Sequence, residues 1–328
     1  MFEVFRCRQH LPELFEVLHF LNMPKPIECV LIGIMGGIFA IATSYSTWVW
    51  AEEGLIAHSS LHKRTLIRFP VQISENENLK GTLSIPKKIN PGIKLPVLLI
   101  FGGFEDAAHV LDLVRTDFQI ALASFDYPFE APRRFEFPSS LKFLPEAKAL
   151  FPKSIRGIAE LVKILKKRSD IDPKRVTLLG ASFGAPFAVA AAAYDPSIAG
   201  LVVVHGFGLG QRTLENVLLR SWIPRLGWIA HPLAWIASRL GWYYLDIPAP
   251  ESLARLLRAN QSVFMITAEK DSFIPREAAD ALWTGFQNSG AQVTRTAMPT
   301  DHLMPGSDKI IDEIIKQIER WMSARGLS

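Results

Sequence analysis

Ser182 lies in a five-residue motif that could present a nucleophile. Residues 180–184 read Gly-Ala-Ser-Phe-Gly; they overlap the end of the apolar run VTLLGA and precede the alanine-rich run PFAVAAAAY. Glycine two residues before and after the serine lets the chain turn sharply from a strand into a helix without a side-chain collision. Such a turn would project the Ser182 hydroxyl above the strand, near the positive end of the helix dipole. The alternative is an ordinary glycine-bounded turn, so the partners of the serine decide between the two.

Two later segments could supply these partners. A serine hydroxyl attacks readily only when a base removes its proton and a third group orients that base. We expect the base to be His302, after the last predicted strand, and the acid to be Asp271, after the strand before it. The order Ser, Asp, His is expected when three such loops meet at one edge of a parallel sheet. Asp301 and Glu269 are rival acids, but Asp301 adjoins His302 and is poorly placed to reach its ring.

The elements that must position these residues are eight strand-like runs that alternate with helical patterns. The first two runs alternate apolar and polar residues, which suits an antiparallel edge with a hairpin turn at Asn76–Asn78, and the other runs are mostly apolar, as in a sheet covered on both faces. We therefore predict an α/β fold with a mostly parallel, doubly wound sheet of about eight strands. The predicted strands cover about 64–73, 79–85, 97–102, 119–125, 176–181, 200–205, 263–268 and 291–297, and the predicted helices about 154–168, 184–194, 251–259, 275–288 and 307–325.

One stretch, residues 207–250, is longer than a plain crossover requires. It contains Trp222, Trp228, Trp235 and Trp242, at intervals of six, seven and seven residues, which keeps them roughly on one helical face. This pattern predicts a helical insertion. The favoured single role of the tryptophans is to pack onto the domain as part of its core. A compatible second role is a lid, in which Trp222, Trp228 and Trp235 line a substrate pocket.

The runs IDPKRVTLLGASFG, AEKDSFIP and DHLMPG carry a resemblance to a known family. Over about residues 64–325 the chain resembles the α/β-hydrolase superfamily, and more narrowly its dienelactone hydrolase and prolyl-oligopeptidase-like branch. The resemblance implies the α/β-hydrolase fold with Ser182 as nucleophile. It also implies that His302 is the general base and then acid, and that Asp271 fixes the tautomer of the imidazole.

A hydrolase of this kind also needs two backbone N–H groups that stabilise a negative oxygen. One is expected from Phe183, the residue after the nucleophile. The other is expected from the loop Phe-Gly-Gly-Phe at 101–104, where Phe104 is favoured over Gly103. Many relatives begin this loop with His-Gly, and this chain has Phe-Gly instead.

The remaining histidines and glycine-rich runs predict neither a metal site nor a cofactor site. His205 begins the run HGFGLG at the end of a predicted strand, near enough to line the pocket, but we expect these residues to form only the exit turn into the insertion. His58, His62 and His109 lack metal-ligand spacing with carboxylates, and neither HExxH nor CxxC occurs, so we predict no metal. No glycine-rich dinucleotide loop or Walker-type loop follows a strand, which implies no nucleotide cofactor.

Ahead of the α/β region, the 23 residues 29–51 contain no Asp, Glu, Lys or Arg. As a helix they would extend roughly 34 Å, enough to cross a hydrocarbon core of about 30 Å. We predict one transmembrane or signal-anchor helix at 27–51. The preceding segment, 1–26, has leucines at helical spacing and is predicted to be amphipathic.

The orientation of this helix rests on few charges. Lys25 on the near side favours a single-pass protein with its catalytic domain outside the cytoplasm, whereas Lys63 and Arg64 on the far side argue for the reverse. An alternative reading starts translation at Met23 and has the apolar segment cleaved as a signal peptide, which would leave a secreted or periplasmic protein.

Composition narrows the remaining function classes. The chain has 328 residues and a net charge of +4, with basic residues scattered among acids, so we expect no nucleic-acid partner.

We predict a membrane-anchored or exported serine hydrolase that cleaves small acyl or aromatic carboxylic esters through an acyl-enzyme. The alternatives are acyl transfer or peptidase activity on the same triad and, in another class, a non-catalytic membrane-tethered binding module. The oligomeric state stays open.

Overall fold

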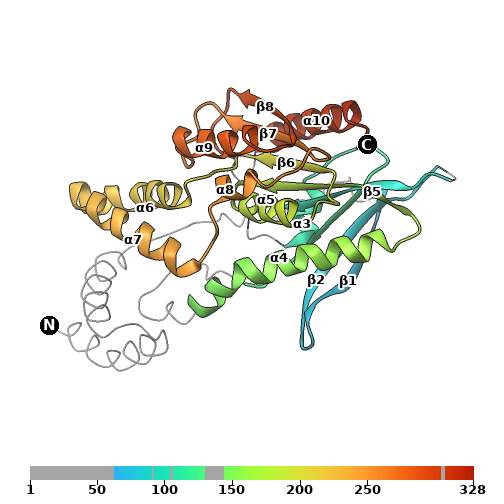
Figure 1. Cartoon of the computed structure of the whole chain (residues 1–328), viewed down its shortest axis with the longest axis horizontal. Coiled ribbons are helices and arrows are strands. Elements are labelled where there is room, and N and C mark those ends of the chain that lie inside the picture. The colour runs from blue at the N-terminus through green and yellow to red at the C-terminus, as the bar shows by residue number, and fades with distance from the viewer. Residues whose placement is uncertain (1–62, 91, 104–105, 130–143, 304–306) are drawn as a thin grey trace.

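The computed structural model describes residues 63–328 apart from residues 91, 104–105, 130–143 and 304–306 (Figure 1). Its eight strands form one sheet in the order β1-β2-β4-β3-β5-β6-β7-β8. The pairs β1–β2 and β2–β4 are antiparallel, and all other neighbouring strands are parallel. The strands are β1 (Arg64–Ser74), β2 (Glu77–Pro86), β3 (Leu95–Phe101), β4 (Ala121–Phe125), β5 (Ile171–Ala181), β6 (Gly200–Val204), β7 (Ser262–Ala268) and β8 (Gln292–Met298). The predicted eight-stranded, mostly parallel sheet is confirmed, with strand bounds that differ by at most five residues.

Helices cover both faces of the sheet (Figure 1). Alternate residues of β3 enter different cores: Val97 and Leu99 join the cluster that packs against α4, α5, α8 and α9, while Leu98 and Ile100 join the one that packs against α3 and α10. Burial on both faces explains why the parallel strands are apolar throughout. These helices are α3 (Ala107–Asp112), α4 (Leu144–Lys166), α5 (Ala185–Tyr194), α8 (Pro250–Ala254), α9 (Arg276–Gln287) and α10 (Asp308–Ala324).

Three helices differ from the prediction. α4 begins at Leu144, ten residues before the predicted start at 154, and continues through Pro152. A proline removes only its own N–H bond and kinks the helix, so a long helix held by packing can tolerate it. α3 was not predicted, because six residues carry too little periodicity, and α8 is shorter than its predicted range.

Two helices separate β6 from β7 in the region of the predicted insertion. They are α6 (Gly210–Leu226) and α7 (Ala230–Leu245), joined by the 3₁₀ turn η5 (Gly227–Ile229), and they form one end of the molecule in Figure 1. Gly227 has a φ of 55°, which glycine adopts easily and which ends α6. The ring of Trp242 packs on Gly210, where a Cβ would lie 2.0 Å from the indole. The two helices therefore pack as an antiparallel hairpin.

The predicted amphipathic segment 1–26 and membrane helix 27–51 lie outside the described residues. Among the helices that the structure describes, none combines the length and the apolar character needed to cross a bilayer.

Candidate active site

Ser182 occupies the sharp turn between β5 and α5. The strand ends at Ala181, the 3₁₀ turn η4 (Ser182–Gly184) follows, and Ser182 has a φ of 49°, a left-handed conformation that is rare for residues with a side chain. A Cβ on Gly180 would lie 2.7 Å from the Cβ of Ala188, and one on Gly184 would lie 1.9 Å from the carbonyl oxygen of Phe101. Glycine is therefore required at both positions for this turn to form.

Three loops at the carboxyl edge of the sheet bring Ser182, His302 and Asp271 together. The Oγ of Ser182 lies 2.8 Å from Nε2 of His302, and Nδ1 of His302 lies 3.0 Å from both carboxylate oxygens of Asp271. The serine follows β5, the acid follows β7 and the histidine follows β8. The side chains of His302 and Asp271 are each only 8% exposed, which shields their interaction from water. This arrangement can pass a proton from the serine to an oriented imidazole.

The Asp271 carboxylate is held in its charged form. Burial by itself would raise its pKa, but the hydrogen bond and charge of His302 and the backbone N–H groups of Ile274 and Phe273 outweigh it, so the pKa lies below its usual range. Those two N–H groups donate to Oδ1 at 2.8 and 3.0 Å. They hold the carboxylate in place, and both of its oxygens remain within hydrogen-bond distance of the imidazole.

The two rival acids lie elsewhere. Oδ1 of Asp301 accepts the backbone N–H groups of Ser272 at 2.7 Å and His302 at 2.6 Å, and these bonds hold the pKa of Asp301 below its usual range. Asp301 therefore ties the acid loop to the histidine loop through their backbones. Glu269 is exposed and has no contact with the imidazole among the described interactions.

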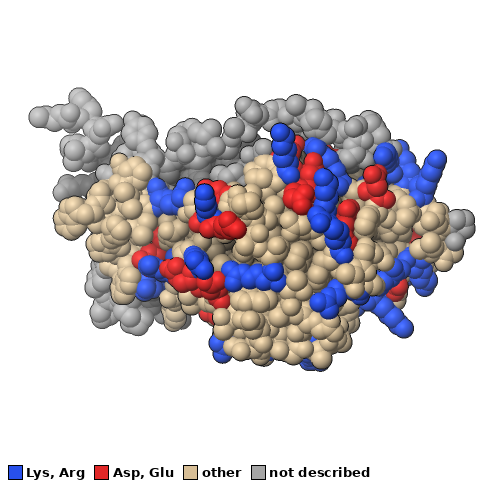
Figure 2. Space-filling view, turned by 90° about the horizontal axis from the view of Figure 1, so that it is seen from above, with Lys and Arg blue, Asp and Glu red and all other residues tan. Residues whose placement is uncertain are grey.

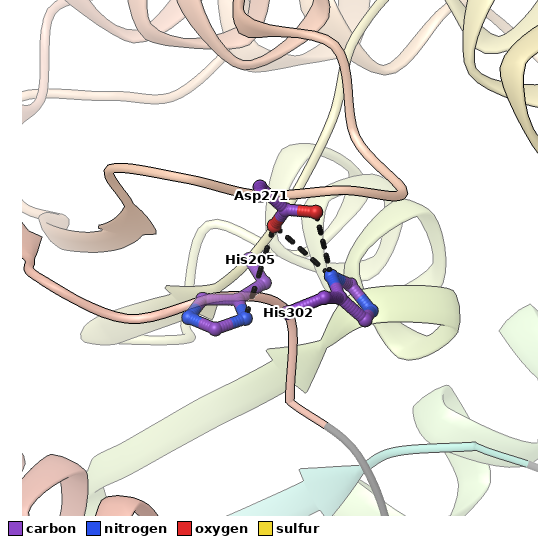
Figure 3. A group of neighbouring side chains, drawn as sticks. All are labelled: His205, Asp271 and His302. Atoms are coloured by element: carbon purple, nitrogen blue, oxygen red, sulfur yellow. Dashed lines mark hydrogen bonds and ion pairs between the residues drawn. The ribbon is translucent and has the colours of Figure 1, made fainter.

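His205 lies against Asp271 and His302; its sequence position put it near the pocket, but only a role in the exit turn was expected of it. It follows β6, is 1% exposed, and its Nδ1 lies 3.9 Å from Oδ2 of Asp271 (Figure 3). The same Nδ1 accepts the backbone N–H of Leu303 at 3.1 Å, so the proton of the neutral ring resides on Nε2. The signal in the sequence is the position of His205 at the carboxyl end of a strand. The structure adds that this strand, β6, lies between β5 and β7, so its carboxyl end falls between the serine and the acid.

The environment of His205 keeps its imidazole neutral. Burial lowers its pKa, and the neighbouring His302 lowers it further, so that it reaches about 4 in spite of the opposing charges of Asp271 and Asp301. A neutral His205 can accept the Leu303 N–H at ordinary pH. Its Nε2 is buried and has no hydrogen-bond partner among the residues described.

Of the expected oxyanion-binding residues, the structure describes Phe183 and Gly103. Phe183 follows Ser182 in η4, and the contact between Gly184 and Phe101 brings the end of β3 against the nucleophile turn. Gly103 lies just beyond that end, and among the described residues a Cβ there would meet no atom within 4 Å. Phe104, the favoured second donor, lies outside the described residues.

Comparison with known proteins agrees with this geometry. A family model described as the dienelactone hydrolase family matches residues 140–302, just under half of the chain, and this range contains the serine, the acid and the histidine. A protein from Klebsiella pneumoniae described as a dienelactone hydrolase has a solved structure that superposes with a TM-score of 0.56 at 17% identity, covering 80% of this chain and 99% of that one. The family match and the shared fold together support the α/β-hydrolase superfamily.

Other solved structures that share this fold include an esterase and a peptidase. An acetyl xylan esterase from Paenibacillus sp. R4 has a TM-score of 0.51 and 15% identity, over 79% of this chain and 90% of that one. An acylaminoacyl peptidase from Pyrococcus horikoshii has a TM-score of 0.56 and 13% identity, over 80% of this chain but 42% of that one. No curated protein matches the sequence. These similarities support a hydrolase and, at such low identity, select no substrate.

Two of the three tryptophans that were expected to line a pocket are largely exposed. Trp228 is 79% exposed and Trp235 is 51% exposed, while Trp222 is half-buried. The expectation that they line a pocket assumed one continuous helix. Instead Trp222 lies in α6, Trp228 in η5 and Trp235 in α7, so the helical phase is lost at the turn. The structure places Trp228 and Trp235 at the surface.

A cavity of about 300 Å³ adjoins the acid side of the site and is lined by groups that include His205, Asp271 and Arg295. Ligand atoms of His205, Asp271 and His302 lie within 4.8 Å of one another, a spacing that could suit a cation. Both Nδ1 atoms are already used, however, by Leu303 N–H and by the carboxylate. A cation there would have to displace the hydrogen bonds that orient the base, so these residues fit a proton relay better than a metal site.

Proposed function

We propose that this α/β-hydrolase cleaves small carboxylic esters with Ser182, His302 and Asp271 as its catalytic triad. The observation that carries the proposal is the continuous relay from Ser182 Oγ to His302 Nε2 at 2.8 Å and from His302 Nδ1 to Asp271 at 3.0 Å. Each bond is within the length expected of a functional hydrogen bond.

The proposed reaction has two stages. His302 Nε2 takes the proton of the Ser182 hydroxyl as its oxygen attacks the ester carbonyl, and the resulting imidazolium then protonates the departing alkoxide. A water molecule, deprotonated by the same nitrogen, attacks the acyl-enzyme and releases the acid, which restores the serine. Asp271 holds the imidazole of His302 in the tautomer with its proton on Nδ1 and stabilises the imidazolium that forms. Its lowered pKa means that it stays ionised throughout.

Two backbone N–H groups would stabilise the tetrahedral oxyanion. Phe183 donates one, and Gly103 or Phe104 donates the other. The N-terminus of α5, directly after the nucleophile turn, adds a favourable electrostatic contribution.

An ester fits this chain better than a peptide. The acetyl xylan esterase of Paenibacillus is matched over 90% of its length, whereas the acylaminoacyl peptidase is matched over only 42%. The Phe273 ring centroid is 5.1 Å from that of His302, and Phe183, the residue after the nucleophile, is half-buried. Such apolar surface suits an acyl or aromatic ester.

A fluorophosphonate probe tests the triad directly. We expect it to label the wild-type chain and not Ser182→Ala, while the exposed Ser323→Ala variant, the matched control, labels normally. A folded wild type that does not label would favour a non-catalytic binding module.

Turnover of p-nitrophenyl esters of increasing acyl length, compared with turnover of aminoacyl p-nitroanilides, tests the ester assignment. Product analysis with an added alcohol separates hydrolysis from acyl transfer.

We further propose that residues 27–51 anchor the enzyme in a membrane with its catalytic domain outside the cytoplasm. The support is the 23-residue stretch without a charged side chain. Resistance to alkaline extraction, with protease digestion of the domain only from the outer side, is the expected result. Release into the soluble fraction with a shortened N-terminus would instead indicate signal cleavage.

A further inference from the structure

The fully buried residues of helix α7 are small, and several of its large apolar residues are exposed. Ala230, Ala234 and Ser238 are its buried residues, and they recur every four positions, so they share one face. Trp235 is 51% exposed and Tyr243 is 82% exposed. A helix that packs only onto its own domain places large apolar side chains inward. The outward face of α7 is therefore suited to another surface.

This apolar surface continues around the end of the hairpin. Trp228 in η5 is 79% exposed, and Ile223 and Ile229 beside it are each 43% exposed. Of the ten large apolar side chains that are exposed among the described residues, six lie between 223 and 243. Figure 2 shows the corresponding end of the molecule as largely uncharged at its outermost part. Single exposed apolar residues are ordinary, but a concentration of this kind marks an interaction site.

The hairpin carries a net positive charge. Its two helices contain four arginines, at 212, 220, 225 and 239, and one acid, Glu215, whose side chain is 8% exposed and pairs with Arg212 and Arg239. The guanidinium of Arg239 lies 4.1 Å from the centre of the Trp235 ring, a cation–π contact at the exposed face. Tryptophan and tyrosine favour the boundary between lipid headgroups and acyl chains, and arginine is attracted to anionic headgroups. A second copy of the same surface would bring like charges together.

We propose that the hairpin 216–245 docks on an anionic lipid bilayer, with Trp228 and Ile229 inserted at the headgroup boundary and Trp235 and Tyr243 lying along it. This contact is separate from the N-terminal segment, and it does not depend on whether the chain is an enzyme.

The docked hairpin would hold the candidate site near the bilayer, because α6 is bonded to the acid loop. The Asn216 amide donates to the carbonyl oxygens of Ser272 and Phe273, at 3.2 and 2.8 Å. Arg220 donates to Ser272 O at 2.9 Å, and its guanidinium lies 4.6 Å from the centre of the Phe273 ring. Phe273 in turn contacts His302. The docking surface and the catalytic base are therefore linked through one short loop.

The test must report on the hairpin and not on the N-terminal segment. We would place an environment-sensitive fluorophore at Trp228→Cys in the full chain, in a Cys7→Ser/Cys29→Ser background. Tyr194→Cys, at the end of α5, is the matched control, because Tyr194 is also exposed, at 55%. The labelled chains are reconstituted with vesicles of phosphatidylcholine and phosphatidylglycerol, and Tyr243→Cys provides a second position on the hairpin.

We expect a several-fold rise and a blue shift of emission at 228 and 243, quenched by nitroxide-labelled lipid, with no change at 194. Emission at 228 and 243 that stays as in water, or an equal change at 194, would overturn the proposal. An equal response in vesicles of phosphatidylcholine alone would overturn the requirement for anionic lipid. A shift that grows with protein concentration in the absence of vesicles would assign the surface to a second copy of the chain. Fluorophosphonate labelling of the same samples reports separately on the proposed enzyme activity.

Discussion

Nδ1 of His205 accepts a hydrogen bond from the backbone N–H of Leu303, the residue directly after the candidate base. The bond joins the end of β6 to the loop that carries His302, and the two imidazole rings lie 5.4 Å apart between centroids. His205 is therefore in a position to fix the loop of the base. It acts on the reaction through His302 and not by touching the substrate.

We predict that His205→Leu lowers kcat about tenfold, since leaving a partly buried N–H unpaired costs about 1–3 kcal/mol and 1.4 kcal/mol corresponds to a factor of ten. His205→Asn should retain most of the activity, because its side-chain oxygen can accept the same bond and asparagine tolerates the positive φ of 49° at this position. Steady-state kinetics with a p-nitrophenyl ester measures both variants. Equal losses in the two variants would show that the acceptor atom is irrelevant.

The low pKa of His205 predicts a pH-dependent stability. In the folded protein its pKa is about 4, below the ordinary value of 6.5, so the unfolded chain binds the proton first as the pH falls. The stability due to neutral His205 is complete above pH 6.5 and is lost as the pH falls toward 4. We expect Tm to fall across this interval more steeply in the wild type than in His205→Asn. Parallel Tm curves would contradict the prediction.

The two neighbouring aspartates should differ sharply in effect. Asp271→Asn replaces the carboxylate that faces His302 Nδ1, and we expect kcat to fall by about 10⁴, the loss seen when the tautomer of such a base is no longer controlled. Asp301→Asn should cost about tenfold or less, since the amide oxygen can still accept the N–H groups of Ser272 and His302. Rates measured at saturating ester test the comparison. A larger loss in the Asp301 variant would reverse our assignment of the acid.

Gly184 should tolerate no side chain. An added Cβ would lie 1.9 Å from the Phe101 carbonyl oxygen, a contact with backbone that cannot move aside, so Gly184→Ala should destabilise the fold by about 3 kcal/mol, at the upper end of overpacking effects. Gly241→Ala is the matched control, because among the described residues its Cβ would meet only the Leu214 side chain, at 3.4 Å. Chemical denaturation measures both. An unaltered free energy of unfolding in Gly184→Ala would mean that the turn is looser than described.

Local patterns predicted the eight strands and the three loops that carry Ser182, Asp271 and His302. They did so because buried parallel strands must be apolar on both faces and because the carboxyl ends of such strands share one edge. α4 was only partly predicted. Its first turns precede Pro152, where propensity argues against a helix and packing of the long helix prevails.

Only the tertiary structure decided which groups touch. The sheet order sets β6 between β5 and β7, which brings His205 against Asp271, and this order depends on pairing between distant strands and not on local periodicity. The sequence already favoured Asp271 over Asp301 as the acid, and the structure adds the contacts: Asp271 faces the imidazole, while Asp301 accepts backbone N–H groups. The turn at Gly227 reset the helical phase, so tryptophans at regular intervals lie on different faces and Trp228 and Trp235 point to solvent. The residue types that could do chemistry were therefore determined by the sequence, while their mutual distances and exposed faces required the folded chain, because both arise from contacts between segments far apart.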